Sequence, residues 1–183
     1  MRVSLILLAA GRSERFRGNK LLHPVAGRPL AHHAASTLST ISFAERIAVV
    51  GATDPDFAPF GFRSVQAPGN APISASIRKG VAEARANGCE ACLIALADMP
   101  FVPASHFIAL LDAHIADVTA SASNGVKSVP AIFSRAMFSA LETLEGDRGA
   151  RHLLATAASV DADPMWLSDI DTRADLDAFL LGP

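Results

Sequence analysis

The sequence predicts an α/β protein with a mostly parallel central sheet. Short apolar runs rich in Val, Ile and Leu alternate with longer stretches of helical periodicity, which is typical of repeated strand–helix–strand units. The chain has 183 residues, half of them hydrophobic, which is enough for a substantial core. Because no internal repeat or Pro/Gly/Ser-rich linker divides it, we expect residues 1–183 to form one domain.

Each predicted element follows from its local pattern. Strands are expected at apolar runs over residues 3–8, 46–50, 63–66, 92–97, 118–122 and 130–133. Helices are expected where apolar residues recur at helical spacing, over residues 29–39, 73–87, 104–116, 135–142, 150–157 and 173–180. Pro29 suits the first turn of the first helix, where its missing N–H costs nothing. The second helix carries a core-facing stripe formed by Ile73, Ile77, Val81 and Ala84.

The overall charge and the apolar runs exclude some classes of partner. A formal net charge of −2 gives no global field that would attract nucleic acid or a membrane surface. No apolar run approaches the roughly 20 residues that span a bilayer. The first apolar run leads directly into basic residues, which argues against a signal peptide, so we expect a cytoplasmic protein. Cys89 and Cys92 precede a strand, and we interpret them as structural rather than redox or zinc-binding residues.

A basic loop follows the first predicted strand. The segment LAAGRSERFRGNKLL, residues 8–22, contains Arg12, Arg15, Arg17 and Lys20. It matches neither the P-loop pattern nor the GxGxxG fingerprint. The small residues of its Ala9-Ala10-Gly11 turn allow close backbone approach to a ligand, and the amides and basic side chains can hold phosphates. Since ligands bind at the carboxyl ends of strands, the loop predicts a triphosphate site; a solvated charged loop is the alternative.

Acidic residues are placed to complement this loop. Asp98 follows the apolar run CLIALA, and Asp169 and Asp171 stand two apart, so in an extended segment they share one face. A triphosphate carries about four negative charges and is expected to bring Mg²⁺, which prefers carboxylate and phosphate oxygens. Which of Asp169 and Asp171 binds the metal is left open. Either Asp171 or Thr172 is expected to cap the last helix.

Six segments in order resemble the MobA-like nucleotidyltransferase family. The basic loop is similar to the family signature, and five further segments match it in turn: GRPL at 27–30, ISASIR at 73–78, ADMP at 97–100, GDRGAR at 146–151 and DIDT at 169–172. The Ala-Ala-Gly form is similar to the molybdenum cofactor cytidylyltransferase branch, which implies CTP rather than GTP. The resemblance also implies a three-layer αβα, Rossmann-like nucleotidyltransferase fold of the nucleotide-diphospho-sugar transferase type.

The resemblance also implies roles for individual residues. Catalysis would rest on Arg12, Lys20 and Asp98. Acceptor binding would fall to Arg148 and Arg151, and the metal would lie on Asp98 with Asp169 and Asp171. Nucleotide contacts are expected from Leu8, Ala9, Ala10, Gly11, Arg12, Lys20, Ser74, Ser76 and Asp98.

The expected reaction transfers CMP from CTP to a phosphorylated acceptor of the molybdopterin type and releases pyrophosphate. A molybdoenzyme of the xanthine dehydrogenase type would receive the product. Two departures leave the acceptor open: Pro72 stands where the family usually has Gly, and Ser128-Val129-Pro130 stands where the branch tends to have Gly-His-Pro. The alternatives are a GTP- or sugar-phosphate-using nucleotidyltransferase, or a non-catalytic protein that binds molybdenum cofactor and hands it over.

Overall fold

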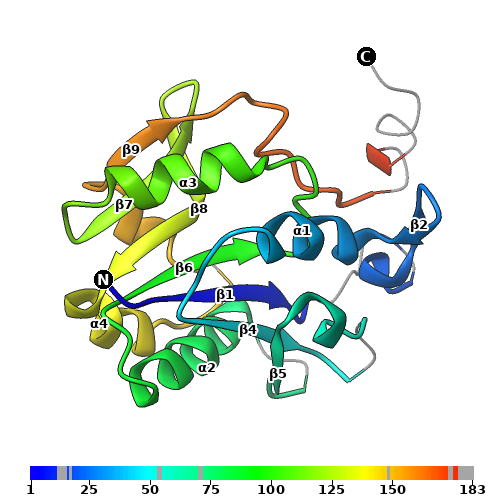
Figure 1. Cartoon of the computed structure of the whole chain (residues 1–183), viewed down its shortest axis with the longest axis horizontal. Helices are drawn as coiled ribbons and strands as arrows, with labels where there is room; N and C mark the ends of the chain where they lie inside the picture. Colours follow the sequence, from blue (N-terminus) through cyan, green and yellow to red (C-terminus); the bar gives the residue numbers. More distant parts are fainter. Residues whose placement is uncertain are drawn as a thin grey trace.

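A seven-stranded sheet with the order β5-β4-β1-β6-β8-β7-β9 forms the centre of the computed structural model (Figure 1). The structure describes residues 1–11, 16, 18–52, 55–69, 72–147, 149–172 and 175–176. The strands are β1 (Val3–Ala9), β4 (Glu45–Val50), β5 (Arg63–Gln66), β6 (Ala91–Leu96), β7 (Val118–Ser123), β8 (Val126–Ser134) and β9 (Ala158–Asp161). Among these strands β8 runs antiparallel to both neighbours, and every other neighbouring pair is parallel. The predicted mostly parallel sheet is confirmed.

Helices cover both faces of this sheet, giving three layers (Figure 1). Helices α1 (Leu30–Ser39) and α3 (Ala104–Ala113) lie on one face, and α2 (Ile73–Ala86) and α4 (Phe138–Glu142) on the other. Short 3-10 helices are η2 (Lys20–Leu22), η3 (Ala58–Phe60), η4 (Arg135–Met137) and η5 (Arg151–Leu154). No helix in the described residues is long and apolar enough to cross a membrane. That residues 1–183 form one domain stays a prediction.

The central strand β1 explains why the sequence forms a buried sheet. All seven of its residues are buried, with Leu5 and Leu7 in the apolar cluster beneath α1 and α3. The alternating residues Ile6 and Leu8 belong to the cluster beneath α2 and α4. A strand covered on both faces reads as a continuous apolar run rather than an alternating one.

Several elements differ from the sequence-based expectation. The helix predicted over 150–157 is wrong, because a single 3-10 turn, Arg151–Leu154, follows Gly149, whose φ is +55°. Strand β9 was not predicted, because as an exposed edge strand it lacks an apolar run. The hairpin of β2 (Pro24–Val25) and β3 (Arg28–Pro29) was also missed, so Pro29 lies just before α1 rather than within it. Most of the helix predicted over 173–180 lies outside the described residues.

The structure buries the two cysteines that the sequence analysis interprets as structural residues. Both are free and buried. Burial, followed by the nearby Glu45 carboxylate, raises the pKa of Cys89 to about 11, and burial raises that of Cys92 further. Because the thiolate is the reactive form, such thiols are inert at neutral pH.

Gly80 marks the closest approach of α2 to the sheet. A Cβ there would lie 2.5 Å from Cγ2 of Ile6 and 3.2 Å from Cγ2 of Val49. We expect Gly80→Ala to lower the free energy of unfolding by about 1–2 kcal/mol, because overpacking strain exceeds the gain in helix propensity. Urea denaturation measures this change. Ala82→Gly, on the exposed side of the same helix, measures the propensity contribution separately, and an equal or more stable Gly80→Ala protein would contradict the prediction.

Candidate active site

The turn after β1 carries the start of the basic loop. Ala9 is buried at the end of β1, opposite Val50 of β4, while Ala10 is half-buried and Gly11 exposed. A Cβ on Gly11 would meet no described atom within 4 Å, so the turn leaves open space beside the backbone. Arg12 lies outside the described residues, as do Arg15 and Arg17.

Lys20 lies at the centre of the acidic residues predicted to face the loop. Its Nζ lies 2.7 Å from Oδ2 of Asp98 and 2.7 Å from Oδ1 of Asp171. The side chain is only 8% exposed. Burial lowers the pKa of Lys20, but the attraction and hydrogen bonds of the two carboxylates outweigh burial and leave the pKa raised. The ammonium group is therefore held charged in a confined position.

The Lys20 backbone is fixed by the turn that begins η2. The Asn19 side chain accepts a hydrogen bond from the Leu21 amide at 3.0 Å, which caps this short helix. The His23 amide donates to the Lys20 carbonyl at 3.1 Å. Local chain geometry thus directs the long Lys20 side chain inward, toward the end of β6.

Three carboxylates meet at this point. Oxygen atoms of Asp98, Asp169 and Asp171 all lie within 4.8 Å of one another. Asp98 lies two residues after the end of β6, and its backbone carbonyl accepts a hydrogen bond from the Ile170 amide at 3.0 Å, which holds the C-terminal segment against the strand end. Partial burial and the neighbouring Asp171 raise the pKa of Asp169. The prediction that these aspartates come together is confirmed.

Alternation around Ile170 places the carboxylates of Asp169 and Asp171 on one side of the chain. Ile170 is 1% exposed and packs in a small cluster with Phe16 and Leu30. Thr172 rather than Asp171 makes the capping interaction: its Oγ1 accepts from the Asp175 amide, and the Asp175 carboxylate accepts from the Thr172 amide. This reciprocal pair is a capping box, and it leaves the Asp171 carboxylate to contact Lys20.

The two serines predicted to bind nucleotide lie in the first turn of α2 and are buried. Ser74 is 0% exposed and Ser76 is 5% exposed. Within the described residues the Ser74 hydroxyl has no hydrogen-bond partner. A buried hydroxyl without a partner is costly, which marks Ser74 as a group that a ligand or water could satisfy.

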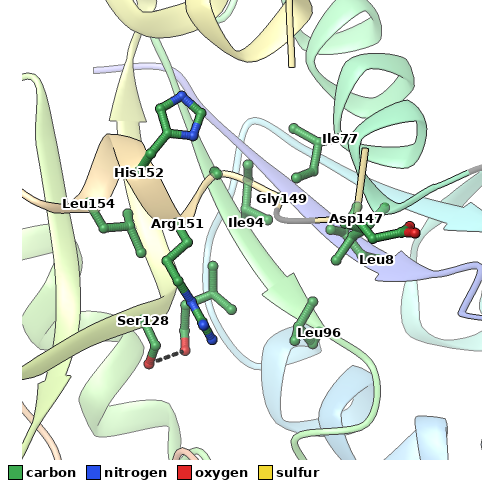
Figure 2. Close-up of a pocket in the computed structure, with 13 residues that line it drawn as sticks. Leu8, Ile77, Ile94, Leu96, Ser128, Asp147, Gly149, Arg151, His152 and Leu154 are labelled. Carbon is green, nitrogen blue, oxygen red and sulfur yellow. Dashed lines mark hydrogen bonds between the residues drawn. The ribbon is translucent and has the colours of Figure 1, made fainter. Parts of the chain in front are cut away.

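A cavity of about 760 Å³ adjoins the strand ends on the α2 face of the sheet (Figure 2). Its polar lining is formed by Ser128, Asp147, Arg151 and His152. Its apolar lining is formed by Leu8, Ile73, Ile77, Ile94, Leu96, Val129, Ala150 and Leu154. Of the two arginines predicted to bind the acceptor, Arg151 is thus beside the cavity, and Arg148 lies outside the described residues.

Sequence reasoning missed this cavity and the ion pairs of Lys20. The apolar residues of β1, β6 and α2 are of the same types whether they fill a core or line a cavity. Lys20 was expected to contact the nucleotide, and no sequence pattern linked it to Asp171, which is 151 positions away.

The sequence of this chain is similar to a known protein family and to a curated relative. Residues 5–162 match the MobA-like NTP transferase domain. The purine catabolism protein PucB of Bacillus subtilis is 29% identical over an alignment that covers 94% of this chain and 93% of PucB.

Solved structures share the architecture at low sequence identity. Rv0371c from Mycobacterium tuberculosis H37Rv superposes over the whole of both chains with a TM-score of 0.84 and 21% identity. The structure of its complex with manganese superposes with a TM-score of 0.81 and 20% identity, again over the whole of both chains. The 4-diphosphocytidyl-2C-methyl-D-erythritol synthase of Anaerococcus prevotii superposes with a TM-score of 0.79 and 17% identity. The match covers 98% of this chain and 95% of that one. The predicted Rossmann-like nucleotidyltransferase fold is confirmed, and the match over residues 5–162 shows that this chain belongs to the MobA-like NTP transferase family.

Proposed function

We propose that this protein is a divalent-metal-dependent cytidylyltransferase that transfers CMP from CTP to a phosphorylated acceptor. The observation that carries the proposal is the pairing of the Lys20 ammonium with Asp98 and Asp171, in a cluster of three carboxylates past the carboxyl end of β6, the strand beside β1. This is the edge at which open α/β sheets bind their ligands. The Ala-Ala-Gly sequence of the turn supports CTP over GTP as the nucleotide substrate.

The nucleotide would lie across the turn and the first residues of α2. Leu8, Ala9, Ala10 and Gly11 would contact it closely, and Lys20 would stabilise its phosphates. Ser74 and Ser76 would complete the contacts after a local adjustment that exposes their hydroxyls. Arg12 keeps its expected place beside the phosphates as part of the proposal.

The chemistry needs alignment and charge stabilisation rather than a general base. An oxygen of the acceptor's phosphate attacks the α-phosphorus of CTP and forms a new P–O bond. The bond from the α-phosphorus to the bridging oxygen breaks, and pyrophosphate leaves with that oxygen and its electron pair. The nucleophile is already anionic near neutral pH, since a phosphate monoester has its second pKa near 6. Lys20 would stabilise the negative charge that gathers on the leaving group.

The acidic cluster suits a divalent cation. The carboxylates of Asp98, Asp169 and Asp171 offer three hard oxygen donors within 4.8 Å of one another, which fits Mg²⁺ or Mn²⁺. When bound, such an ion supplies positive charge that neutralises phosphate oxygens. The manganese complex of the structural neighbour Rv0371c supports a divalent ion here, and we propose Mg²⁺ as the physiological one.

The acceptor is proposed to be of the molybdopterin type, with Arg151 and Arg148 meeting its phosphate. The relative PucB is named as a purine catabolism protein, which supports a purine-oxidising molybdoenzyme of the xanthine dehydrogenase type as recipient. A cytoplasmic location stays a prediction. Transfer to another phosphorylated acceptor, use of GTP, and non-catalytic handover of finished cofactor are the alternatives that the test below separates.

Thermal unfolding with CTP, GTP, ATP and UTP, each with and without Mg²⁺, tests the nucleotide half. CTP at 100 times its dissociation constant is expected to stabilise the protein by roughly 2.7 kcal/mol. The stabilisation should require Mg²⁺ and exceed that by GTP. Pyrophosphate release on adding molybdopterin then tests turnover. CTP binding without pyrophosphate release would favour the handover protein, and the absence of any nucleotide effect would overturn the proposal.

A further inference from the structure

The segment that follows β9 carries two of the three carboxylates of the acidic cluster. Residues 162–171 leave the end of β9, pass α3 and contribute Asp169 and Asp171 to the cluster (Figure 1). At its start, the Ala162 amide donates to a carbonyl of β7 at 2.8 Å, and near its end the Ile170 amide donates to a carbonyl past β6 at 3.0 Å. The contacts between these two bonds determine where the carboxylates lie.

Trp166, the one tryptophan of the chain, makes such a contact. It is half-buried, and its ring centroid lies 5.7 Å from that of His106 on α3, with an angle of 54° between the ring planes. The turn that presents it is fixed locally, because the Asp163 carbonyl accepts from the Trp166 amide at 3.0 Å and the Asp163 carboxylate accepts from the Met165 amide at 2.8 Å. Asp169 follows three residues later, a reach of at most about 11 Å, so holding the indole limits where its carboxylate can lie.

His106 is itself fixed by a chain of hydrogen bonds to the sheet. It is 3% exposed in the first turn of α3, and its Nε2 lies 2.8 Å from Oγ of Ser121 on β7. The Ser121 hydroxyl donates to the Pro130 carbonyl of β8 at 2.7 Å. Because a hydroxyl has one proton to donate, its oxygen must accept from His106, which assigns the proton of the neutral imidazole to Nε2. Burial lowers the pKa of His106, so the ring is neutral at pH 7.

We propose that His106 and Trp166 are positioning residues for the metal site, and that their ring contact holds the carboxylates of Asp169 and Asp171 within reach of Asp98. This inference rests on the proposed function, which assigns a divalent cation to these three aspartates. A carboxylate that is not held in place must be ordered when the cation binds, and the cost of ordering lowers the affinity. Loss of the ring contact should therefore weaken metal binding without removing any ligand.

Mn²⁺ binding to the full chain, followed by electron paramagnetic resonance, tests the proposal. His106→Ala and Trp166→Ala should each bind Mn²⁺ about tenfold more weakly, as is typical when a group that orients a metal ligand is removed. The double variant should bind no more weakly than either single variant, because both substitutions remove the same contact. Trp166→Phe keeps an aromatic ring and should restore affinity close to that of the wild type. Additive losses, or wild-type affinity in both alanine variants, would overturn the proposal.

His106→Gln separates the ring from its hydrogen bond. Glutamine keeps an N–H donor for Ser121 but has no ring to contact Trp166, so this variant should bind Mn²⁺ as weakly as His106→Ala. Wild-type affinity would show that the hydrogen bond alone matters and would contradict a role for the ring contact.

His114→Ala is the matched control. His114 forms the corresponding pair at the other end of α3, where its Nδ1 lies 3.0 Å from Oγ1 of Thr119 on β7. It is eight residues from His106, or about 12 Å along the helix axis. The substitution removes the same kind of contact between α3 and the sheet and should leave Mn²⁺ affinity unchanged. Urea denaturation of each variant establishes that it is folded.

Amide hydrogen exchange provides a measurement that needs no metal. In His106→Ala and Trp166→Ala the Ile170 amide should exchange several-fold faster than in the wild type, because the segment opens more often at that end. The Ala162 amide, which pairs with β7 at the start of the segment, should exchange at its wild-type rate.

The outcomes separate this inference from the proposed function. If the wild type binds Mn²⁺ and the variants change neither its affinity nor the exchange of the Ile170 amide, the inference fails and the proposed metal site stands. Faster exchange with unchanged Mn²⁺ affinity would make the ring pair purely structural and would also overturn the inference. If the wild type binds no Mn²⁺, the metal assignment of the proposed function fails, while exchange of the Ile170 amide still reports whether the ring pair holds the segment.

Discussion

Replacing Asp98 by asparagine is expected to reduce turnover with CTP and molybdopterin by at least about a hundredfold, comparable to losing one preorganised electrostatic group. Asp98 contributes one of three carboxylates in the cluster and pairs with Lys20 at 2.7 Å. The amide keeps the shape of the side chain but removes its charge, and so weakens both the cation site and the position of Lys20. Pyrophosphate release measures turnover, and Mn²⁺ binding followed by electron paramagnetic resonance gives a readout independent of activity.

The fold should survive this substitution. The contact that holds the C-terminal segment uses the Asp98 backbone carbonyl, which accepts from the Ile170 amide and is unchanged in asparagine. Asp112→Asn, an exposed aspartate on α3, is the matched control and should keep normal turnover and Mn²⁺ binding. A normal rate in Asp98→Asn, with the protein folded, would refute the assignment of Asp98 to the metal and to catalysis.

The sheet and the acidic cluster could be predicted because each depends on the local sequence and on one rule of topology, that parallel strands end at the same edge of a sheet. The apolar run before Asp98 predicts a buried strand, and parallel strands bring their carboxyl ends to one edge, so the basic loop and Asp98 were expected at the same edge of the sheet. The spacing of Asp169 and Asp171 sufficed to place both on one side of an extended segment.

What could not be predicted depends on long-range packing. Nothing local distinguishes Leu8 and Ile77, which line a cavity, from Leu5 and Val81, which fill the core. The segment after Gly149 has a helical sequence pattern, yet it forms only the 3-10 turn Arg151–Leu154 before the chain enters β9 at Ala158. Lys20 contacts Asp171 only because the C-terminal segment of the chain packs back beside the end of β6.

Replacing Lys20 by methionine is expected to reduce both turnover and stability. Turnover should fall by at least about a hundredfold, because the variant loses the charge that stabilises the leaving pyrophosphate. The free energy of unfolding should fall by about 2–3 kcal/mol. Removing one partner of a fully buried ion pair costs about 3–5 kcal/mol. The cost is lower here because the side chains of Asp98 and Asp171 remain 18% and 23% exposed.

The pH dependence and a matched lysine test this account of stability. The pKa of Lys20 is raised in the folded protein, so its contribution is fully present below the ordinary lysine value of about 10.4 and is lost only as pH rises through the higher folded value. The stability difference between wild type and variant should therefore not shrink between pH 7 and 9 through loss of the lysine charge. Lys79→Met, which breaks an exposed pair with Glu83, should cost at most about 0.5 kcal/mol.

Adding a divalent cation distinguishes a structural lysine from one that shares the acidic cluster with a metal. In the wild type the ammonium already lies against Asp98 and Asp171, so Mn²⁺ must displace it and should stabilise the free protein only weakly. In Lys20→Met the same carboxylates have lost that cation, so Mn²⁺ should bind more tightly and restore much of the lost stability. Urea denaturation with and without Mn²⁺ measures both proteins. Equal stabilisation of the two would mean that Lys20 and the metal do not compete, and that the carboxylates facing Lys20 are not the metal ligands.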